Sequence, residues 1–196
     1  YQNFKDLNWS LNFKLTLSYI CADLKAFIYI TLLLSFSVFS QEEKFVLSTV
    51  AFYNVENLFD AVDDPKNSWD QNWLNDGVWN EEIYQQKLNN ISKVIPEIGQ
   101  DYTQNHPTII GLCEVENRKV LIDLVQSEPM IKYNYGIIHF DSPDERGIDV
   151  ALLFDRLRFK PKKAKSYPLK LKRNDGQRDF TRDQLLVEGF LKKETP

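Results

Sequence analysis

Two short segments of the chain end an apolar run with side chains that could do chemistry. Phe52 to Asp60 reads FYNVENLFD and carries Asn54 and Glu56, and Gly111 to Asn117 reads GLCEVEN and carries Glu114. A carboxylate at the rim of a buried strand costs free energy unless it is compensated, and a hard divalent cation is the usual compensation. If the two strands are neighbours, these side chains converge where α/β sheets bind ligands. They could equally be ordinary strand-end polar residues in contact with water.

Two later segments place arginines at the starts of expected strands. Asp144 to Phe154 reads DERGIDVALLF, with Arg146 in a turn and Asp149 at the beginning of the strand. Phe180 to Phe190 reads FTRDQLLVEGF, with Arg182 ahead of the strand. The guanidinium fork matches the oxygens of phosphate, so arginines at these positions would suit a phosphate ligand. Taken singly, each could also form a surface ion pair.

The elements that must position these side chains are predicted from hydrophobic periodicity. In the first half of the chain we expect a strand over Phe45–Val55, a helix over Glu81–Gly99, a strand over Thr108–Cys113 and a helix over Asn117–Gln126. The second half is strand-rich, with strands expected over Tyr135–Phe140, Asp149–Phe154, Arg158–Ser166 and Leu185–Leu191. The alternation of strand and helix predicts an α/β layered domain.

The helix over Glu81–Gly99 carries the clearest boundary signals. Asn80 can cap its first turn, and Glu81 and Glu82 follow at positions where the helix dipole favours acids. Pro96 predicts a kink or an early end, because proline cannot donate a backbone hydrogen bond.

The first 40 residues differ in character from the rest. Ala26 to Phe39 is an uncharged apolar stretch that follows Lys25 and ends at Ser40. It has the length of a signal-peptide core and is shorter than the about 20 apolar residues of a membrane span. A buried helix or an uncleaved anchor are the alternatives. We therefore expect a presequence over 1–40 with a signal-peptide-like segment over 24–40, an exported domain over 41–196, and no stable membrane insertion after cleavage.

The segment Tyr1–Asp23 contains no initiator methionine, since Met130 is the only methionine in the chain. A signal peptide begins close to its basic residue, so we expect translation to start near Leu24 and Lys25. N-terminal sequencing of the exported protein tests this expectation, and a fragment that begins at Tyr1 would contradict it.

Composition gives the class of chain but not its partner. A content of 43% hydrophobic and 27% charged residues is that of a globular protein. The net charge of −4 makes no general case for a nucleic-acid or membrane surface. One local cluster does, because Arg156 to Arg173 contains nine basic residues and no acid. That cluster suits a polyanion backbone, although the solvated face of a hairpin can have the same composition.

Together and in this order, the four segments resemble the endonuclease/exonuclease/phosphatase family of metal-dependent phosphoesterases, in the form of its exported bacterial members. FYNVENLFD resembles the first motif, in which an Asn follows an apolar strand. GLCEVEN resembles the second, in which a Glu after an apolar strand binds the metal. RGIDVALLF and TRDQLLVEGF resemble later strands of the family's N-terminal half, so the resemblance covers about residues 44–192.

The resemblance implies a four-layer α/β/β/α sandwich, with two mixed sheets face to face and helices outside. It implies that Glu114 binds Mg²⁺, with Mn²⁺ or Ca²⁺ as alternatives, and that Glu56 is a second acid near the metal. Asn54 would lie beside the scissile phosphate and the attacking water. The positions that it assigns to the substrate phosphate are Arg146, Asp149 and Arg182.

The sequence departs from the family pattern in one respect. The family's second half carries an Asp-x-Asn after a Gly and a terminal Ser-Asp-His, and neither motif occurs in this sequence. The histidines are His106 and His139, and neither follows Ser-Asp. We therefore expect the chain to represent the N-terminal half of the sandwich, to expose a sheet face or edge, and to be a very weak catalyst by itself.

The leading functional prediction is metal-dependent hydrolysis of phosphodiester bonds in DNA or RNA. Hydrolysis of a phospholipid or an inositol phosphate is the alternative within the family, because loops around a shared metal core set the substrate. A non-catalytic binding module of the same fold is the alternative of another class. Gly-Asp-x-Asn and Ser-Asp-His encoded downstream in the gene would favour the enzyme.

Overall fold

The computed structural model describes residues 24–25, 27–29, 46–65, 69, 74 and 77–192. The chain divides into two compact units, Tyr1–Phe45 and Val46–Pro196, and each is described by itself. The described residues of the first unit are helical, and the rest of the predicted presequence lies outside the described residues. Within the described ranges, we find no helix with the length and apolarity that a membrane span requires.

A four-stranded sheet forms the centre of the second unit. In spatial order it consists of β1 (Val50–Leu58), β2 (Ile109–Val115), β4 (Asp149–Asp155) and β3 (Tyr135–His139). β1 and β2 are parallel, whereas β4 is antiparallel to both β2 and β3. Because β1 and β2 run parallel, their carboxyl ends lie at the same edge of the sheet.

The helices begin where the sequence provides caps. α3 (Glu81–Glu97) begins after Asn80, whose side-chain oxygen accepts a hydrogen bond from the Ile83 amide at 3.0 Å. Pro96 lies inside its last turn, so the helix ends early rather than kinking in the middle. α4 (Gln100–Thr103) follows directly, and α6 (Glu128–Ile131) follows α5 (Arg118–Gln126).

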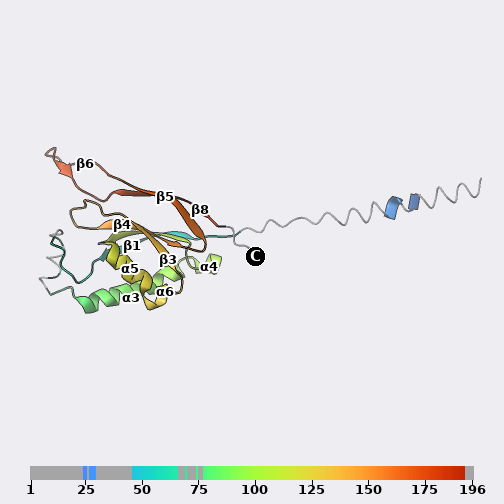
Figure 1. The fold of residues 1–196 in the computed structure, drawn as a ribbon, viewed down its shortest axis with the longest axis horizontal. Coiled ribbons are helices and arrows are strands. Elements are labelled where there is room, and N and C mark those ends of the chain that lie inside the picture. Colours follow the sequence, from blue (N-terminus) through green and yellow to red (C-terminus); the bar gives the residue numbers. More distant parts are fainter. Residues whose placement is uncertain are drawn as a thin grey trace, which may run out of the picture. The chain divides into compact units, whose positions relative to one another are not determined.

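The hydrophobic core lies between the sheet and α3, α5 and α6, which cover one of its faces (Figure 1). α5 contributes the fully buried Val120, Leu121 and Leu124. The core side chains that α3 and the sheet contribute include Tyr84, Leu88, Ile91, Ile95, Val55, Ile110, Leu112, Val115 and Leu153. Burial of each large aliphatic side chain contributes about 1.5–3 kcal/mol, so this layer holds the carboxyl ends of β1 and β2 in place.

A second, smaller layer lies on the other side of the four-stranded sheet from the helices (Figure 1). It is the antiparallel pair β5 (Phe159–Tyr167) and β8 (Gln184–Leu191). The connection between them contains the short pair β6 (Leu171–Lys172) and β7 (Arg178–Asp179). This side of β1 is open, and Phe52 is 86% exposed. The expected exposure of a sheet face or edge stays a prediction.

The predicted α/β class is confirmed. The full four-layer sandwich stays a prediction, because the second sheet has two strands in the described part of the chain. The strand expected over Thr108–Cys113 extends further, because β2 continues through Glu114 to Val115. Both boundaries of the first expected strand were wrong. β1 runs from Val50 to Leu58 rather than over Phe45–Val55, because the strand continues past Asn54 through an irregular segment that rejoins β2 at Leu58.

Candidate functional site

The carboxyl ends of β1 and β2 are both distorted at the same level. The register of the pair shifts between Asn54 and Leu58, and β2 carries one extra residue, Glu114, relative to β4. Glu56, Asn57 and Glu114 have positive φ angles of 55°, 60° and 66°. The left-handed conformation costs about 1–2 kcal/mol for a residue other than glycine. Such strain gathers at functional sites, and bulges re-aim side chains there.

The bulge in β1 is held by three hydrogen bonds. The Asn54 side-chain oxygen accepts from the Glu56 amide at 2.8 Å, and the Asn57 carbonyl accepts from the Phe59 amide at 3.2 Å. The Lys87 ammonium reaches over from α3 and donates to the Glu56 carbonyl. Burial lowers the pKa of Lys87, although the charges of Glu56 and Glu114 oppose the shift. Lys87 therefore lies within electrostatic range of both acids.

Glu114 is held by two arginines. Its side chain is 15% exposed, and its Oε1 lies 3.3 Å from Arg146 Nη2 and 3.8 Å from Arg182 Nη1. Arg182 also approaches Asp144, with 3.7 Å between Nε and Oδ2. Asp144 in turn accepts hydrogen bonds from the backbone amides of Arg146 and Gly147 at 3.0 and 2.9 Å. The structure thus brings three of the predicted site residues, Glu114, Arg146 and Arg182, into one cluster.

Asn54 faces the same region from β1. It lines a cavity of about 520 Å³ between the open sheet face and the start of β8, together with Cys113 and Arg182. It also lines a second cavity of about 240 Å³ with Glu56 and Lys87. Burial, and then the charge of Glu114, raise the pKa of Cys113, which keeps it protonated and makes it a poor nucleophile.

The structure gives Asp149 other partners. Its Oδ2 lies 2.9 Å from His139 Nε2, and its Oδ1 accepts from the Ser142 amide at 2.9 Å and the Ser142 hydroxyl at 2.6 Å. These bonds tie the end of β3 and the following loop to β4. Among the ion pairs of the described residues, none joins Asp149 to the arginines on Glu114.

Sequence reasoning missed a second group of ligand atoms. His139, Asp141 and Asp149 have ligand atoms within 4.8 Å of one another, a spacing that could hold a metal ion. Asp141 and Asp149 also line an acidic cavity of about 520 Å³, whose other acidic lining residues are Asp64, Glu116, Asp144 and Glu145. The local sequence signal was His-x-Asp at the end of a strand, His139 to Asp141. The third residue of the group, Asp149 on β4, comes ten residues after His139.

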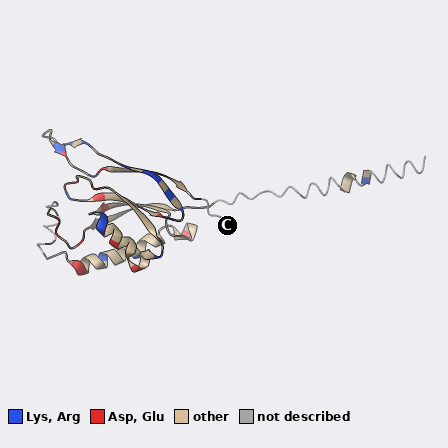
Figure 2. Ribbon diagram, in the orientation of Figure 1, with Lys and Arg blue, Asp and Glu red and all other residues tan. Residues whose placement is uncertain are grey.

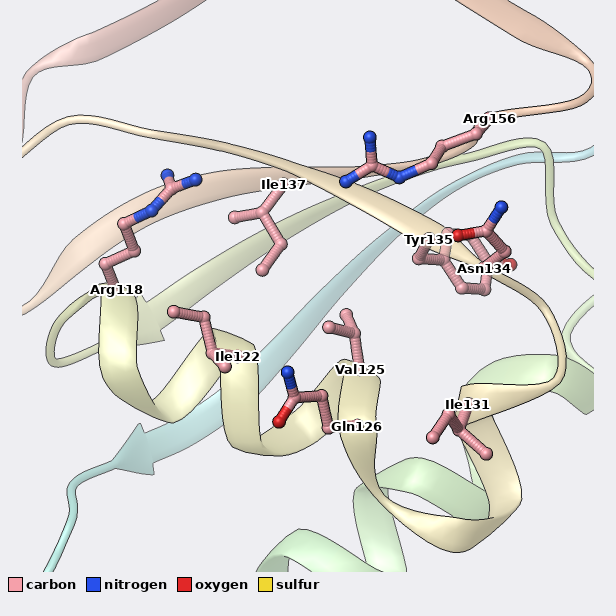
Figure 3. Close-up of a pocket in the computed structure, with 9 residues that line it drawn as sticks. All are labelled: Arg118, Ile122, Val125, Gln126, Ile131, Asn134, Tyr135, Ile137 and Arg156. Carbon is pink, nitrogen blue, oxygen red and sulfur yellow. The ribbon is translucent and has the colours of Figure 1, made fainter.

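A further cavity lies on the helical side of the sheet edge. It has a volume of about 350 Å³ and lies between α5, α6 and β3, with Arg118 and Arg156 at its margin (Figure 3). Apolar side chains such as Ile122 and Ile137 point into it (Figure 3). None of the predicted site residues lines it, so the candidate site stays with the bulged ends of β1 and β2.

The donors at this edge suit a hard cation. Glu114 and Glu56 offer carboxylate oxygens, which are the ligand type that Mg²⁺ and Ca²⁺ prefer. Two guanidinium groups beside a half-buried carboxylate provide for an anion at the same place. Side chains of the types that bind cations and phosphates thus lie at one edge of the sheet, where α/β proteins bind their ligands.

Comparison with protein families makes this indication specific. The model of the Endonuclease/Exonuclease/phosphatase family matches residues 49–195, well over half of the chain. The chain therefore belongs to the Endonuclease/Exonuclease/phosphatase family, and the resemblance predicted from the four motifs is confirmed. Comparisons with curated proteins and with solved structures gave no match. Membership supports a hydrolase of the phosphoesterase or nuclease type, and members of the family typically use divalent metals.

Proposed function

We propose that this chain carries the metal- and phosphate-binding edge of a metal-dependent phosphodiester hydrolase that acts on DNA or RNA. One observation carries the proposal. Glu114 stands in a left-handed bulge with Arg146 and Arg182 on its carboxylate, so a cation ligand and two phosphate ligands share one place.

Each side chain has a role in this proposal. Glu114 and Glu56 hold the cation, which is Mg²⁺ with Mn²⁺ or Ca²⁺ as alternatives, and bound Mg²⁺ would neutralise charge on the phosphoryl and leaving oxygens. Arg146 and Arg182 bind the phosphate. The Asn54 oxygen is committed to the Glu56 amide, so its NH₂ group is the donor that can reach phosphate or water. Asp149 positions the loop after β3 rather than binding phosphate.

General base catalysis is the weak part of the site. His106 pairs with Asp155, and His139 pairs with Asp141 and Asp149, so neither histidine is in contact with Glu114 among the ion pairs of the described residues. The Gly-Asp-x-Asn and Ser-Asp-His motifs do not occur in the 196 residues. Loss of an acid–base group typically costs about 10²–10⁴-fold in rate. We therefore propose weak hydrolysis by this chain alone.

An assay on labelled DNA tests the proposal. The 196-residue chain should cleave slowly with Mg²⁺, and EDTA or Glu114→Gln should abolish the cleavage. Glu97→Gln, which neutralises an exposed acid at the end of α3 on the helical side, is the matched control and should leave the rate unchanged. Cleavage that survives Glu114→Gln would contradict the assignment of Glu114, and a rate near that of a complete enzyme of the family would contradict the expected weakness.

The exposed face of the β5–β8 pair supports nucleic acid as the substrate. Lys160, Lys163 and Lys165 lie on β5 opposite Phe190, Glu188 and Leu186 of β8, and all six side chains are exposed. Figure 2 shows positive charge along β5 and on the β6 hairpin. Lysines combined with exposed aromatic rings suit a single-stranded backbone and its bases, because cations contact phosphates and rings stack on bases.

Salt-dependent binding of a labelled single-stranded oligonucleotide tests the substrate class. Replacing Lys160, Lys163 and Lys165 together with serine should weaken binding and reduce its salt dependence. The matched control is a triple serine substitution of Lys93, Lys119 and Lys132 on the helical side. Equal loss in both variants, or hydrolysis of phospholipid or inositol phosphate without oligonucleotide binding, would overturn the choice of nucleic acid.

We also propose that the protein is exported, on the strength of the uncharged apolar stretch that follows Lys25. Expression of the chain with its native N-terminus in a bacterial host should give an exported product that begins near Gln41. A product that retains residues 24–40 would contradict cleavage, and one found only inside the cell would contradict export.

A further inference from the structure

The inference concerns how the affinity for the cation depends on bound phosphate, and the reverse. It rests on the proposed function. Glu114 Oε1 is 3.3 Å from Arg146 Nη2 and 3.8 Å from Arg182 Nη1. Glu114 is also the residue proposed to bind the cation. In the structure described, the two arginines therefore contact one of the two carboxylate oxygens that Glu114 can offer to a cation, and their positive charge lies beside the other.

A cation and the two guanidinium groups cannot share this oxygen without repulsion. Mg²⁺ approaches its oxygen ligands to about 2.0–2.1 Å, which would place it against both arginines. Like charges at such separations disfavour one another strongly when they are partly removed from water. A cation that binds Glu114 must therefore displace the guanidinium groups or tolerate them at a cost in affinity.

The two arginines are accessible to partners other than Glu114. Arg146 and Arg182 are 38% and 32% exposed, whereas Glu114 is 15% exposed, so an anion from solvent can reach the guanidinium groups. Arg182 already has a second partner, because its Nε lies 3.7 Å from Asp144 Oδ2. Thr181 Oγ1 lies 3.5 Å from that same oxygen, so the backbone just ahead of Arg182 is anchored while its guanidinium points to Glu114.

A phosphate would resolve the repulsion. Its oxygens match the guanidinium fork better than a single carboxylate oxygen at 3.3–3.8 Å does. Once the guanidinium groups bind phosphate, Glu114 is released to the cation, and the negative phosphate also offsets the charge between cation and arginines. Each ligand thus removes the obstacle to the other.

We propose that Arg146 and Arg182 form a latch on Glu114, so that phosphate and divalent cation bind this chain cooperatively and each binds poorly without the other. Coupling of this kind is reciprocal, and it typically amounts to about 5–150-fold in affinity. The site would then engage its cation chiefly when a phosphoester is present.

Titration of the wild-type chain with Mg²⁺, by calorimetry, tests the latch without any substitution. Saturating inorganic phosphate should increase the Mg²⁺ affinity about 5–150-fold. The same titration of Glu114→Gln corrects for Mg²⁺–phosphate association in solution and should show no increase. An unchanged affinity in the wild-type chain would overturn the latch.

Substitution of the arginines provides a second test of the latch. Arg182→Gln should bind Mg²⁺ more tightly than the wild type when phosphate is absent, and the effect of phosphate should shrink toward onefold. Arg156→Gln, which removes one positive charge at the sheet edge near β3, is the matched control and should behave as wild type. An Arg182→Gln chain with weaker Mg²⁺ binding in the absence of phosphate would overturn the latch.

The outcomes separate the latch from the proposed function. Mg²⁺ binding that depends on Glu114 but ignores phosphate leaves the metal site in place and removes only the latch. Mg²⁺ binding that is the same in wild type and Glu114→Gln removes both, because Glu114 would then not be a ligand.

Discussion

The two ends of β4 hold two different kinds of acid–arginine cluster. At the Asp155 end, the carboxylate is 3% exposed and receives Arg158 Nε at 2.6 Å and His106 Nε2 at 2.9 Å. The Leu157 amide donates to its other oxygen at 2.7 Å. At the Glu114 end, the contacts are 3.3 and 3.8 Å, the arginines are a third exposed, and the backbone is strained.

This difference separates a structural cluster from a binding site. The Asp155 cluster satisfies its acceptors internally and is closed to ligands, and the His106 ring also packs on Tyr133 with 4.3 Å between centroids. In the Glu114 cluster, the left-handed backbone conformation of Glu114 costs free energy, and the charges are only loosely paired. A site in which the arginines must leave the acid for a phosphate, so that the acid can take a cation, needs this looser arrangement.

The largest expected effect is a loss of stability when the closed cluster at Asp155 is broken. Asp155→Ala leaves Arg158 and His106 without their shared carboxylate, and removal of one partner of a buried pair typically costs about 3–5 kcal/mol. Urea unfolding should show this loss, while Glu114→Gln should change the unfolding free energy by less than about 1 kcal/mol. Equal losses in both variants would remove the distinction between the clusters.

The strain at Glu114 predicts a smaller effect on stability, in which glycine is favoured over alanine. At φ 66°, glycine is relaxed and alanine is not, so Glu114→Gly should be more stable than Glu114→Ala by about 1 kcal/mol. In a regular strand the order is reversed, so Ser166→Ala should be more stable than Ser166→Gly in β5. Parallel urea unfolding of the four variants measures both differences. Alanine more stable than glycine at both positions would show that Glu114 is not strained.

The closed cluster also predicts a dependence of stability on pH. Burial, and then the charge of Arg158, lower the pKa of His106 below 6.5, although Asp155 opposes the shift. The unfolded chain therefore binds the proton more readily, so stability is full above pH 6.5 and falls as the pH drops toward the lowered pKa. His106→Gln should flatten this part of the curve. A wild-type stability that rises between pH 6.5 and pH 5 would contradict this sign.

Asp155 adds a second window at lower pH. Burial alone would raise its pKa, but hydrogen bonds from Arg158 and the Leu157 amide outweigh burial and lower it below 3.8. Its contribution is therefore present above pH 3.8 and is lost as the pH falls through the lowered pKa. Urea midpoints between pH 5 and pH 3 should decline less steeply in Asp155→Asn than in the wild type.

The smallest expected effect concerns Lys87. Its hydrogen bond to the Glu56 carbonyl stabilises the bulge, while its burial opposes the charge, so Lys87→Met should change the unfolding free energy by about 1 kcal/mol or less. Lys93→Met, an exposed position on the same helix, is the control. A loss of about 3 kcal/mol or more would place Lys87 with the closed cluster instead.

Local patterns predicted the elements that carry the site. Asn80 caps α3 as its position suggested, and α5 follows Asn117 where a helix was expected. The apolar runs before Glu114 and Asn54 form the parallel strands β2 and β1. Those features depend on neighbouring residues in the sequence, so the sequence reveals them.

Features that depend on distant residues were not predictable in the same way. The bulge at Glu56 is closed by Lys87 from α3, and the Asp155 cluster joins residues 49 positions apart in the chain. Asp149 looked like a residue beside phosphate because it begins a strand after an arginine-bearing turn, but its oxygens bond to His139 and Ser142. The residues next to Asp149 in the sequence do not indicate these hydrogen-bond partners.

The most direct test is Mg²⁺ calorimetry, in the presence of phosphate, on the wild type, Glu114→Gln, Asp141→Asn and Glu188→Gln. A metal site at the bulged ends of β1 and β2 predicts binding at least about 10–100-fold weaker in Glu114→Gln and unchanged in Glu188→Gln. Asp141→Asn tests the group around His139 and should bind as the wild type does. Undiminished binding in Glu114→Gln together with loss in Asp141→Asn would contradict the assignment and move the metal to the His139 group.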